Sequence, residues 1–426
     1  MSATVNRYPR YCWVVLGLAW LVMVVTTWGW NLIPSLAYQL FPDLGLTQFK
    51  YTLIFTAPVL MTMFVALPGG ALADRYGIRI VVGISAFVAA ITGFLRAYTP
   101  TFGGMFFLMC LRGIAWGMTI PNLPKLVGIW FPPKRTGLAS GIYLTGMGMG
   151  SALGLFTGPL FPDWRAAFII TGIINLIVAV LWAVFARSCP EEVSIDRPSI
   201  ISGLKAGIKS KNIWLVGVAQ FLFMGALMSF QGNLVKAYIG VHQMSPQTAA
   251  TLASFLTLGL ATGNLTLPAL SDRVGLRRPF IFIGATAGAI LLFLSWKLAP
   301  SPVIWATAFI GGVITGGAPP VMFAVPAELP EIGEGYIGGA SGLAVALMNA
   351  GGFLLTLLIT SPVMAPGTAS AYNSGFLISV LLLAAIVLPA FFLLETGRRS
   401  LRGSPPFLAT GGDSVEPRSK LVFPKT

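Results

Sequence analysis

The chain alternates long apolar runs with short polar connections along its whole length. Twelve runs are each long enough, at about 1.5 Å per residue, to cross a hydrocarbon core about 30 Å thick. The first six cover residues 13–34, 48–72, 78–98, 101–127, 136–160 and 164–187, and the second six cover 212–237, 247–271, 279–298, 302–326, 336–361 and 373–395. This pattern predicts an all-α membrane protein with twelve transmembrane helices, the first of which is too long for the apolar core of a signal peptide.

Composition supports this prediction. Of the 426 residues, 56% are apolar and 9% are charged, whereas soluble domains carry about 25% charged residues. The net charge of +14 would suit a nucleic-acid partner, but the basic residues fall in the short connections, where they set membrane topology. We therefore expect a lipid bilayer around the chain and no nucleic-acid partner.

The distribution of Lys and Arg predicts the orientation. Connections on the side of the N-terminus hold 21 of the 27 basic residues. One more, Arg112, lies inside a span, and the opposite side holds five, namely Lys50, Arg96, Arg165, Lys236 and Lys297. The positive-inside rule then places both termini in the cytoplasm of a multi-pass protein of the plasma membrane, or of the inner membrane in a Gram-negative cell.

The sequence also indicates an internal repeat. The charged segment 70–79, which we interpret as a turn between two spans, has a weaker copy at 268–278, and their aspartates Asp74 and Asp272 are 198 positions apart. A second pair of similar segments enters spans 5 and 11, with Ser140 and Ser341 offset by 201 positions. We expect an N-terminal half (1–187), a charged cytoplasmic linker (188–211), a C-terminal half (212–397) and a disordered cytoplasmic tail (398–426).

The segment Gly70-Ala71-Leu72-Ala73-Asp74-Arg75-Tyr76-Gly77-Ile78-Arg79 resembles the G-x-L-a-D-R-x-G-r-[RK] signature of the major facilitator superfamily, which also lies between spans 2 and 3. The resemblance implies a twelve-helix fold with alternating access, in which this cluster closes the cytoplasmic side. The candidate gating residues are Gly70, Asp74, Arg75, Gly77 and Arg79, with Asp272 and Arg273 from the copy. A simple cytoplasmic turn would explain the arginines but not the spaced glycines.

An acidic connection follows span 10. It carries Glu328, Glu331 and Glu334 without any Lys or Arg, which is unusual for a cytoplasmic connection. We interpret these glutamates as counter-charges for Arg75 and Arg79 across the two halves, which would make Glu328 and Glu331 gating residues as well.

A further resemblance narrows the family. Trp130-Phe131-Pro132-Pro133-Lys134-Arg135, followed by Gly137 to Gly141, is similar to the junction of spans 4 and 5 in anion porters such as oxalate/formate exchangers and nitrate, nitrite or cyanate carriers. The nitrate porters also carry an Arg in span 2 and another in span 8, and neither span has one here. We therefore do not expect nitrate itself as the substrate.

Arg112 lies near the middle of span 4 and is the only charged residue that we place at membrane depth. A charge at that depth costs at least about 2.5 to 3.5 kcal/mol and is functional by default. Its planar fork of donors suits a carboxylate or a similar oxyanion, with Trp116 one turn further along the same face. The alternative is a structural or proton-linked arginine, which the family resemblance also allows.

The positions of the acidic residues favour an anion as the substrate over a drug that is exported in exchange for protons. All 13 Asp and Glu residues fall in connections, span ends or the tail, and the single histidine, His242, follows span 7. We therefore predict a secondary transporter of a small organic or inorganic anion that works by exchange or by proton-linked movement. The alternatives are an efflux transporter of neutral or cationic compounds with a structural Arg112, and a receptor or scaffold that has lost transport.

Other polar and aromatic residues are candidates for the substrate cavity. They are Trp30 and Asn31 in span 1, Tyr143 in span 5, Gln220 and Gln231 in span 7, and Asn349 in span 11. Each has a second explanation: an interfacial aromatic belt for the tryptophan, a gate for Tyr143, and helix packing for Asn349 beside its glycines.

No enzyme or cofactor signature stands out. The glycine-rich segments 146–150 and 311–317 lack the Lys-Ser/Thr ending of a phosphate-binding loop, so we expect them to serve close helix packing. The three cysteines have no paired spacing that would suggest a disulfide or a metal site. We expect a monomeric transporter without a cofactor and without enzymatic activity.

Overall fold

The computed structural model describes residues 11–187, 200–333 and 336–397. Its secondary structure within these ranges is helical throughout, with no strand. In the first half the elements are α1 (Cys12–Ser35), α2 (Ala37–Asp43), α3 (Gln48–Tyr76), α4 (Ile78–Leu95), η1 (Arg96–Tyr98), α5 (Phe102–Thr119), α6 (Asn122–Trp130), α7 (Pro133–Thr157), η2 (Gly158–Leu160) and α8 (Trp164–Phe185). After α9 (Ile200–Lys209), the second half contains α10 (Lys211–His242), α11 (Pro246–Val274), α12 (Arg278–Lys297), α13 (Val303–Gly316), α14 (Ala318–Glu328), α15 (Ile337–Leu355), η4 (Thr356–Thr360), α16 (Ser361–Met364), α17 (Ala369–Ala384) and α18 (Val387–Phe392).

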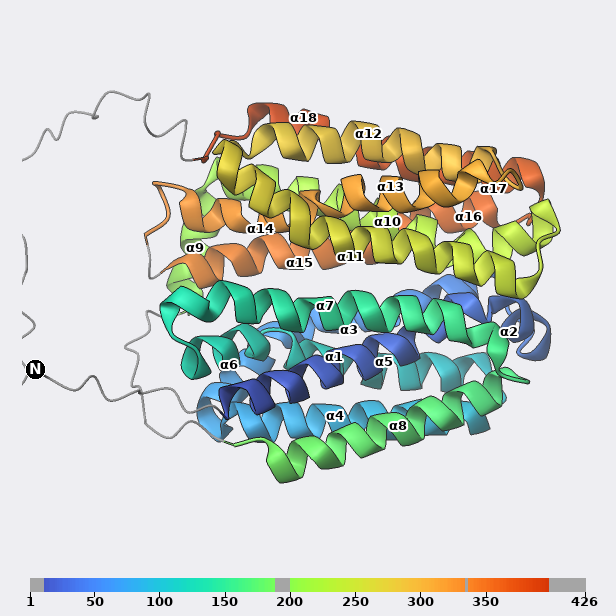
Figure 1. Cartoon of the computed structure of the whole chain (residues 1–426), viewed down its shortest axis with the longest axis horizontal. Helices are drawn as coiled ribbons and strands as arrows, with labels where there is room; N and C mark the ends of the chain where they lie inside the picture. The colour runs from blue at the N-terminus through green and yellow to red at the C-terminus, as the bar shows by residue number, and fades with distance from the viewer. Residues whose placement is uncertain (1–10, 188–199, 334–335, 398–426) are drawn as a thin grey trace, which may run out of the picture.

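Eleven segments of the described chain are long and apolar enough to cross a membrane. Each begins and ends within about five residues of a predicted span, because hydropathy alone sets these boundaries. The remaining predicted span, 136–160, corresponds to α7, which has 25 residues and lies lengthwise in the bundle between α1 and α11 (Figure 1). Its glycines and its polar first turn lower its hydropathy, so α7 is not among the eleven.

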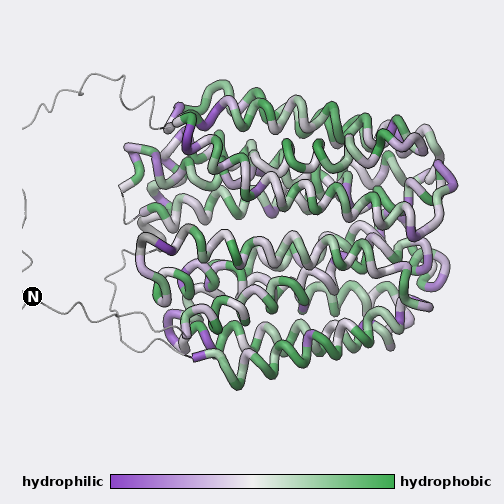
Figure 2. Tube along the Cα trace, in the orientation of Figure 1, coloured by the Kyte–Doolittle hydropathy of each residue, from purple (hydrophilic) through white to green (hydrophobic). Residues whose placement is uncertain are grey.

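Polar residues gather mainly at the two ends of the bundle, and apolar residues cover the length between them (Figure 2). We call the end where α3 passes into α4 the signature end, and it is the end that the basic residues predict to be cytoplasmic. The opposite end, where α1 passes into α2, is called the outer end.

The helix contacts repeat between the two halves. In the first half α1 packs on α7, α3 on α5, and α4 on α8. In the second half α10 packs on α15, α11 on α13, and α12 on α17, which is the same set of contacts one repeat later. Each half has its own hydrophobic core, and the halves meet where α7 packs on α11 and α3 on α15.

The glycine-rich segments serve the expected close packing. A Cβ on Gly146 or Gly150 would lie closer than 3.0 Å to a backbone oxygen of α1, and real Cβ atoms do not come that close. Gly148, between them on the opposite face of α7, is equally close to Ala261 of α11. The alternating glycines therefore let α7 approach one helix of its own half and one helix of the other.

One local prediction needs correction. The signature segment is not a turn, because α3 continues through Asp74 to Tyr76 and only Gly77, with φ of 89°, interrupts the helix. Such a positive φ is easily adopted by glycine alone. Within the predicted linker, residues 200–209 form α9, which packs on α15 through Gly203 and Gly339. Residues 188–199 and the tail 398–426 lie outside the described residues.

Candidate functional site

Arg112 lies in α5 with its guanidinium buried between α1 and α4. Its Nη1 donates to the carbonyl oxygen of Ala89 at 3.0 Å, and its Nη2 donates to the carbonyl oxygen of Thr26 at 2.5 Å. Its Nε, which is also buried, has no hydrogen-bond partner. The predicted membrane-depth arginine is therefore held by two backbone carbonyls and keeps one free donor.

Arg96 lies beside Arg112, and sequence reasoning misplaced it. It was expected in an outer connection, but its side chain is fully buried. Its guanidinium stacks on the ring of Phe168 at 4.2 Å, and its Nη1 reaches the Sδ of Met109 at 3.5 Å. Its Nε and Nη2 have no hydrogen-bond partner. Arg96 begins the short helix η1, and a residue at a span end can turn its long side chain back into the bundle.

Gly29 of α1 brings the two guanidinium groups together. A Cβ at this position would lie 2.8 Å from Nη2 of Arg112 and 3.4 Å from Nη2 of Arg96. Gly93 of α4 also faces this group, with its Cβ position at an ordinary van der Waals distance of 3.9 Å from Nη1 of Arg112. Glycine at position 29 thus provides the space that Arg112 needs, and the two like charges lie side by side.

No carboxylate that the structure describes compensates these charges. The described acidic residues lie at helix ends or in connections, and the ion pairs that they form are with other basic residues. They are Asp43, Asp74, Asp163, Asp272, Glu328, Glu331 and Glu395. The first half therefore carries two buried positive charges without a described counter-ion, an arrangement that attracts anions and repels cations.

Two tryptophans lie next to the arginine pair in sequence. Trp30 follows Gly29, and Trp116 is one helical turn beyond Arg112. Their rings meet edge to face at 6.2 Å, and the indole N–H of Trp30 donates to the carbonyl oxygen of Phe55 at 3.0 Å. Both side chains are buried, so they form part of the interior of the first half rather than an interfacial belt.

Asn31 and Tyr143 lie along the packing of α1 with α7. The Asn31 amide donates to Ser151 Oγ and to the carbonyl oxygen of Thr27, both at 3.1 Å, and so ties the two helices together. Tyr143 is buried in the hydrophobic core of the first half. These two residues are brought to one helix pair and not to Arg112.

The candidates in the second half lie apart from one another. Gln231 donates to Thr257 Oγ1 at 3.3 Å, and Asn349 donates to the carbonyl oxygen of Val345 in its own helix at 3.0 Å. Gln220 is buried, and neither its oxygen nor its nitrogen has a hydrogen-bond partner. An unsatisfied buried amide is costly, which makes Gln220 the candidate in this half with the clearest free hydrogen-bonding capacity.

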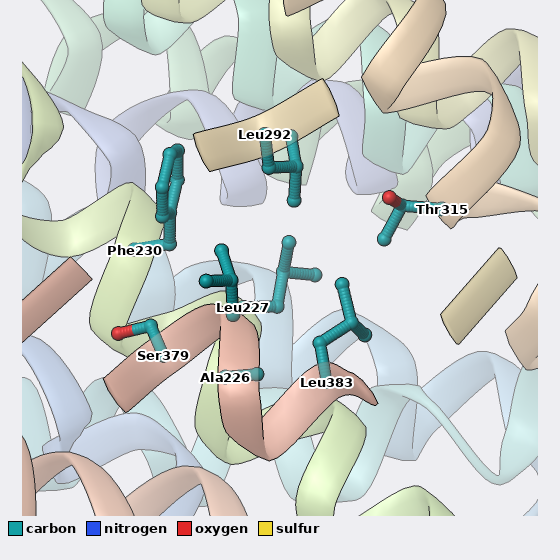
Figure 3. A pocket seen from close by; sticks show the side chains of 8 residues that line it. Ala226, Leu227, Phe230, Leu292, Thr315, Ser379 and Leu383 are labelled. Carbon is teal, nitrogen blue, oxygen red and sulfur yellow. The ribbon is translucent and has the colours of Figure 1, made fainter. Parts of the chain in front are cut away.

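The second half has no arginine at the position that corresponds to Arg112. Gly113 approaches α3 at Pro58, and Gly312, 199 positions later, approaches α11 at Leu256. Arg112 therefore corresponds to Gly311. Beside α13, the helix that holds Gly311, is a cavity of about 10 Å³ (Figure 3). It is lined by Ala226, Leu227, Phe230, Leu292, Thr315, Ser379, Val380 and Leu383.

That cavity is nearly apolar. The buried hydroxyl of Thr315 has no hydrogen-bond partner, and Ser379 donates to the carbonyl oxygen of Gly375. Its volume is about that needed for one water molecule. Of the two repeated positions, only the one in the first half carries charge.

The signature residues form contacts within the first half. Asp74 pairs with Nζ of Lys125 in α6 at 2.9 Å, and the same ammonium donates to the carbonyl oxygen of Gly70. A Cβ on Gly70 would lie 3.4 Å from that ammonium, so this glycine makes room for it. Arg79 donates to the carbonyl oxygen of Ala183 at the end of α8. Arg75 is exposed and lies over the ring of its neighbour Tyr76 at 5.2 Å.

The weaker copy forms a separate ion-pair network in the second half. Arg277 binds both carboxylate oxygens of Glu328, at 2.5 and 3.1 Å, and Asp272 at 2.6 Å. The hydrogen bonds to Glu328 raise the pKa of the Arg277 guanidinium above its ordinary value. Arg273 is exposed. The sequence does not reveal the pairs Lys125–Asp74 and Arg277–Glu328, because the two members of each pair are 51 positions apart.

The expected pairing of the glutamates with Arg75 and Arg79 is not formed among the described residues. Glu328 binds Arg277, and Glu331 accepts hydrogen bonds from Ser210 and Asn212 near the start of α10. Both glutamates therefore bind their own half, and Glu334 lies outside the described residues.

The outer end joins the two halves through side-chain hydrogen bonds. Gln48 of α3 donates to Asn233 Oδ1 of α10 at 2.6 Å and accepts from Lys236 Nζ at 3.0 Å. The Tyr51 hydroxyl donates to the carbonyl oxygen of Gly232, where Phe55 also packs. These contacts close the outer end of the interface between α3 and α10.

Within the described ranges no three His, Cys, Asp or Glu side chains gather as metal ligands would. The groups described above offer charge, hydrogen bonding and aromatic contact.

Sequence comparison finds transporters of inorganic and organic anions. The chain is 26% identical over 386 residues to the probable nitrate/nitrite transporter NarK2 of Mycobacterium tuberculosis, covering 88% of this chain and 93% of that protein. It is 26% identical over 389 residues to the nitrite extrusion protein of Bacillus subtilis, with the same coverage. It is also 27% identical over 285 residues to the 3-(3-hydroxy-phenyl)propionate transporter of Escherichia coli, covering 64% of this chain and 68% of that one.

Structural comparison and the family model agree with the helix arrangement. A crystal structure of the nucleoside transporter NupG has the same fold, with a TM-score of 0.72, 16% sequence identity, and coverage of 90% of this chain and 98% of that one. The model of the Major Facilitator Superfamily matches residues 19–354. With the repeated six-helix halves and the signature at the end of α3, this match identifies the chain as a membrane transporter that belongs to the major facilitator superfamily.

Proposed function

We propose that this transporter moves a small anion by alternating access and that Arg112 provides the charge that selects it. The observation that carries the proposal is the adjacent burial of Arg96 and Arg112 without a described carboxylate. A bound anion would offset the cost of holding these charges away from water. A cation would meet repulsion from both.

The relatives support an anionic cargo. Two are named for nitrate or nitrite, and a third is named for a phenylpropionate, which carries a carboxylate. In this chain the membrane part of α3 and of α11 has no arginine, since Arg75 and Arg273 lie at the last turn of each helix. We therefore propose a carboxylate or a nitrite-like anion rather than nitrate.

The remaining binding groups are proposed from their position. Trp30 and Trp116 supply aromatic faces next to the arginine pair, and Gln220 supplies an amide with free hydrogen-bonding capacity in the second half. Asn31, Gln231, Asn349 and Tyr143 are proposed as further contacts in other conformations of the transport cycle. Asp74 and Gly70, with Lys125, are proposed to control the signature end.

Exchange, or movement of a proton with the substrate itself, fits the titratable groups. The described acids lie at helix ends or in connections, and His242 packs edge to face against Trp296 at the outer end with ring centroids 4.4 Å apart. A relay of protons through the membrane centre would need such a group there. We propose that the transporter works as a monomer with both termini in the cytoplasm.

The second candidate function is efflux of neutral or cationic compounds. It is favoured by the two hydrogen bonds of Arg112 to the carbonyl oxygens of Thr26 and Ala89. In that case the arginine would serve only to fasten α5 to α1 and α4, and its charge would not face the cargo.

Counterflow in proteoliposomes distinguishes the two. The panel is nitrite, formate, nitrate and 3-(3-hydroxyphenyl)propionate, with wild type, Arg112→Lys, Arg112→Gln and the control Arg165→Gln. Arg165 is half exposed and pairs with Asp43 at the outer end, so its loss should leave transport intact. We expect uptake of at least one anion, reduced at least tenfold in Arg112→Gln. Normal transport of every responsive anion by both Arg112 variants would contradict the anion site.

A further inference from the structure

Lys236 is a basic residue at the outer end of the bundle, whereas Arg96 and Arg112 are buried inside the first half. It belongs to α10, yet its two contacts belong to the first half of the chain. Its Nζ donates to Gln48 Oε1 at 3.0 Å and lies 3.4 Å from the centre of the Phe41 ring. Lys236 therefore bridges the interface between the halves with its charge.

The contacts of this ammonium are neutral. The Gln48 amide is oriented by its second bond, in which Nε2 donates to Asn233 Oδ1, so its oxygen is left for Lys236. Asp43, the acid nearest in sequence to Phe41 and Gln48, is engaged by Arg165 at 3.6 Å and by the indole N–H of Trp164 at 2.8 Å. Among the described residues, no carboxylate forms an ion pair with Lys236.

Opening of the outer end must break both contacts together. Phe41 lies in α2 and Gln48 in α3, whereas Lys236 lies in α10, so separation of the halves on this side removes both partners at once. Asn233 retains a hydrogen bond to the carbonyl oxygen of Ser229 in its own helix. Lys236 is left with a positive charge and an unfilled need for an acceptor.

We propose that Lys236 is the outer-gate contact for the transported anion, which replaces Gln48 and Phe41 as its partner when the outer end opens. This inference rests on the proposed anion transport and adds a residue to it. The anion gains a charge-assisted contact only in the outward-open state. Closure returns Lys236 to Gln48 and releases the anion toward the arginine pair.

The test compares the two faces of the membrane. Initial rates of labelled nitrite and labelled 3-(3-hydroxyphenyl)propionate uptake are measured in whole cells, for the outer face, and in inverted vesicles, for the inner face. Lys236→Gln keeps a donor for Gln48 and removes only the charge. Lys236→Arg keeps the charge, and Lys50→Gln is the matched control, since Lys50 also lies over an aromatic ring, Phe102, but within its own half.

We expect the outer KM of Lys236→Gln to rise about fivefold, the effect of losing one partly screened charge contact. Its inner KM should change less than twofold, and its outer KM should depend less on ionic strength than that of wild type. Lys236→Arg and Lys50→Gln should both resemble wild type.

Three results would overturn the inference. An outer KM within twofold of wild type in Lys236→Gln would show that the charge does not meet the anion. An equal rise at both faces, or an unchanged dependence on ionic strength, would indicate a structural role for the lysine. Failure of wild type to transport either probe would overturn the anion function and, with it, this role of Lys236.

Discussion

The Nη2 atoms of Arg96 and Arg112 both lie close to Gly29, at 3.4 and 2.8 Å from the position that a Cβ on this glycine would take. Two like charges are thus buried together, where each disfavours the other and three of their nitrogens lack acceptors. Such an arrangement destabilises the resting protein and is expected where a ligand of opposite charge compensates it.

Replacing Arg96 by an apolar residue should therefore raise the stability of the protein while it weakens binding of the anion. Arg96→Met removes an unpaired buried charge with unsatisfied donors, and hydrophobic replacement even of buried ion pairs is often neutral or stabilises by about 1 to 4 kcal/mol. We expect a higher Tm of the purified protein and a higher KM for the anion. Thermal unfolding in detergent and counterflow measure the two effects.

Arg165→Met is the control for that experiment. Arg165 also stacks on an aromatic ring, that of Trp164, but it is half exposed and paired with Asp43. Its loss should change stability by no more than about 1 kcal/mol and leave the KM unchanged. A loss of both stability and transport in Arg96→Met would instead assign Arg96 a structural role.

The packing of α1 on α7 predicts opposite effects of two glycine substitutions. In Gly150→Ala the added Cβ would collide with the backbone of Val24 and the hydroxyl of Thr27. Overpacking of this kind lowers the free energy of unfolding by about 1 to 3 kcal/mol. Gly17, in α1, has no atom within 4 Å of its Cβ position, so Gly17→Ala should gain up to about 1 kcal/mol of helix stability. Thermal unfolding of both variants checks this, and equal stability of the two would refute the packing argument.

The ion pairs predict which charge reversals rescue each other. Arg277→Glu should lower stability, and the second change Glu328→Arg should restore it, because these side chains bind each other directly. Arg79→Glu should not be rescued by Glu328→Arg, because Arg79 binds the carbonyl oxygen of Ala183 instead. Expression level and Tm of the single and double variants provide the measurement. Rescue of Arg79→Glu by Glu328→Arg would instead support the pairing of these two residues across the halves that the sequence suggests.

Transport of an anion that stays ionised should depend little on pH. His242 is the single histidine of the chain, lies at the outer end against Trp296, and is the only side chain whose ordinary pKa falls between about pH 6 and pH 8. Nitrite exchange should therefore vary less than twofold over this range in both wild type and His242→Gln. A tenfold change per pH unit in wild type that is lost in His242→Gln would show that this protein group carries protons through the cycle.

The polar pattern of the chain was enough to predict the helices but not the partners of the charges. The predicted spans match the observed ones within about five residues, because the bilayer requires long apolar helices whatever their neighbours. The repeat was visible as well, since Asp74 and Asp272 occupy equivalent positions at the ends of α3 and α11. The observed partners of Glu328 and Glu331 were not predicted, because charge alone does not specify distance.

The sequence by itself determined the membrane-spanning helices, their duplication and the depth of Arg112, all of which follow from hydropathy and position along one helix. Only the tertiary structure decided that Arg96 turns inward to lie beside Arg112, that Lys125 meets Asp74, and that Lys236 reaches across to Gln48. The physical reason is that a long basic side chain at a helix end can point to either side of that end. Its direction depends on which neighbouring helices leave room for it, and those neighbours are distant in the chain.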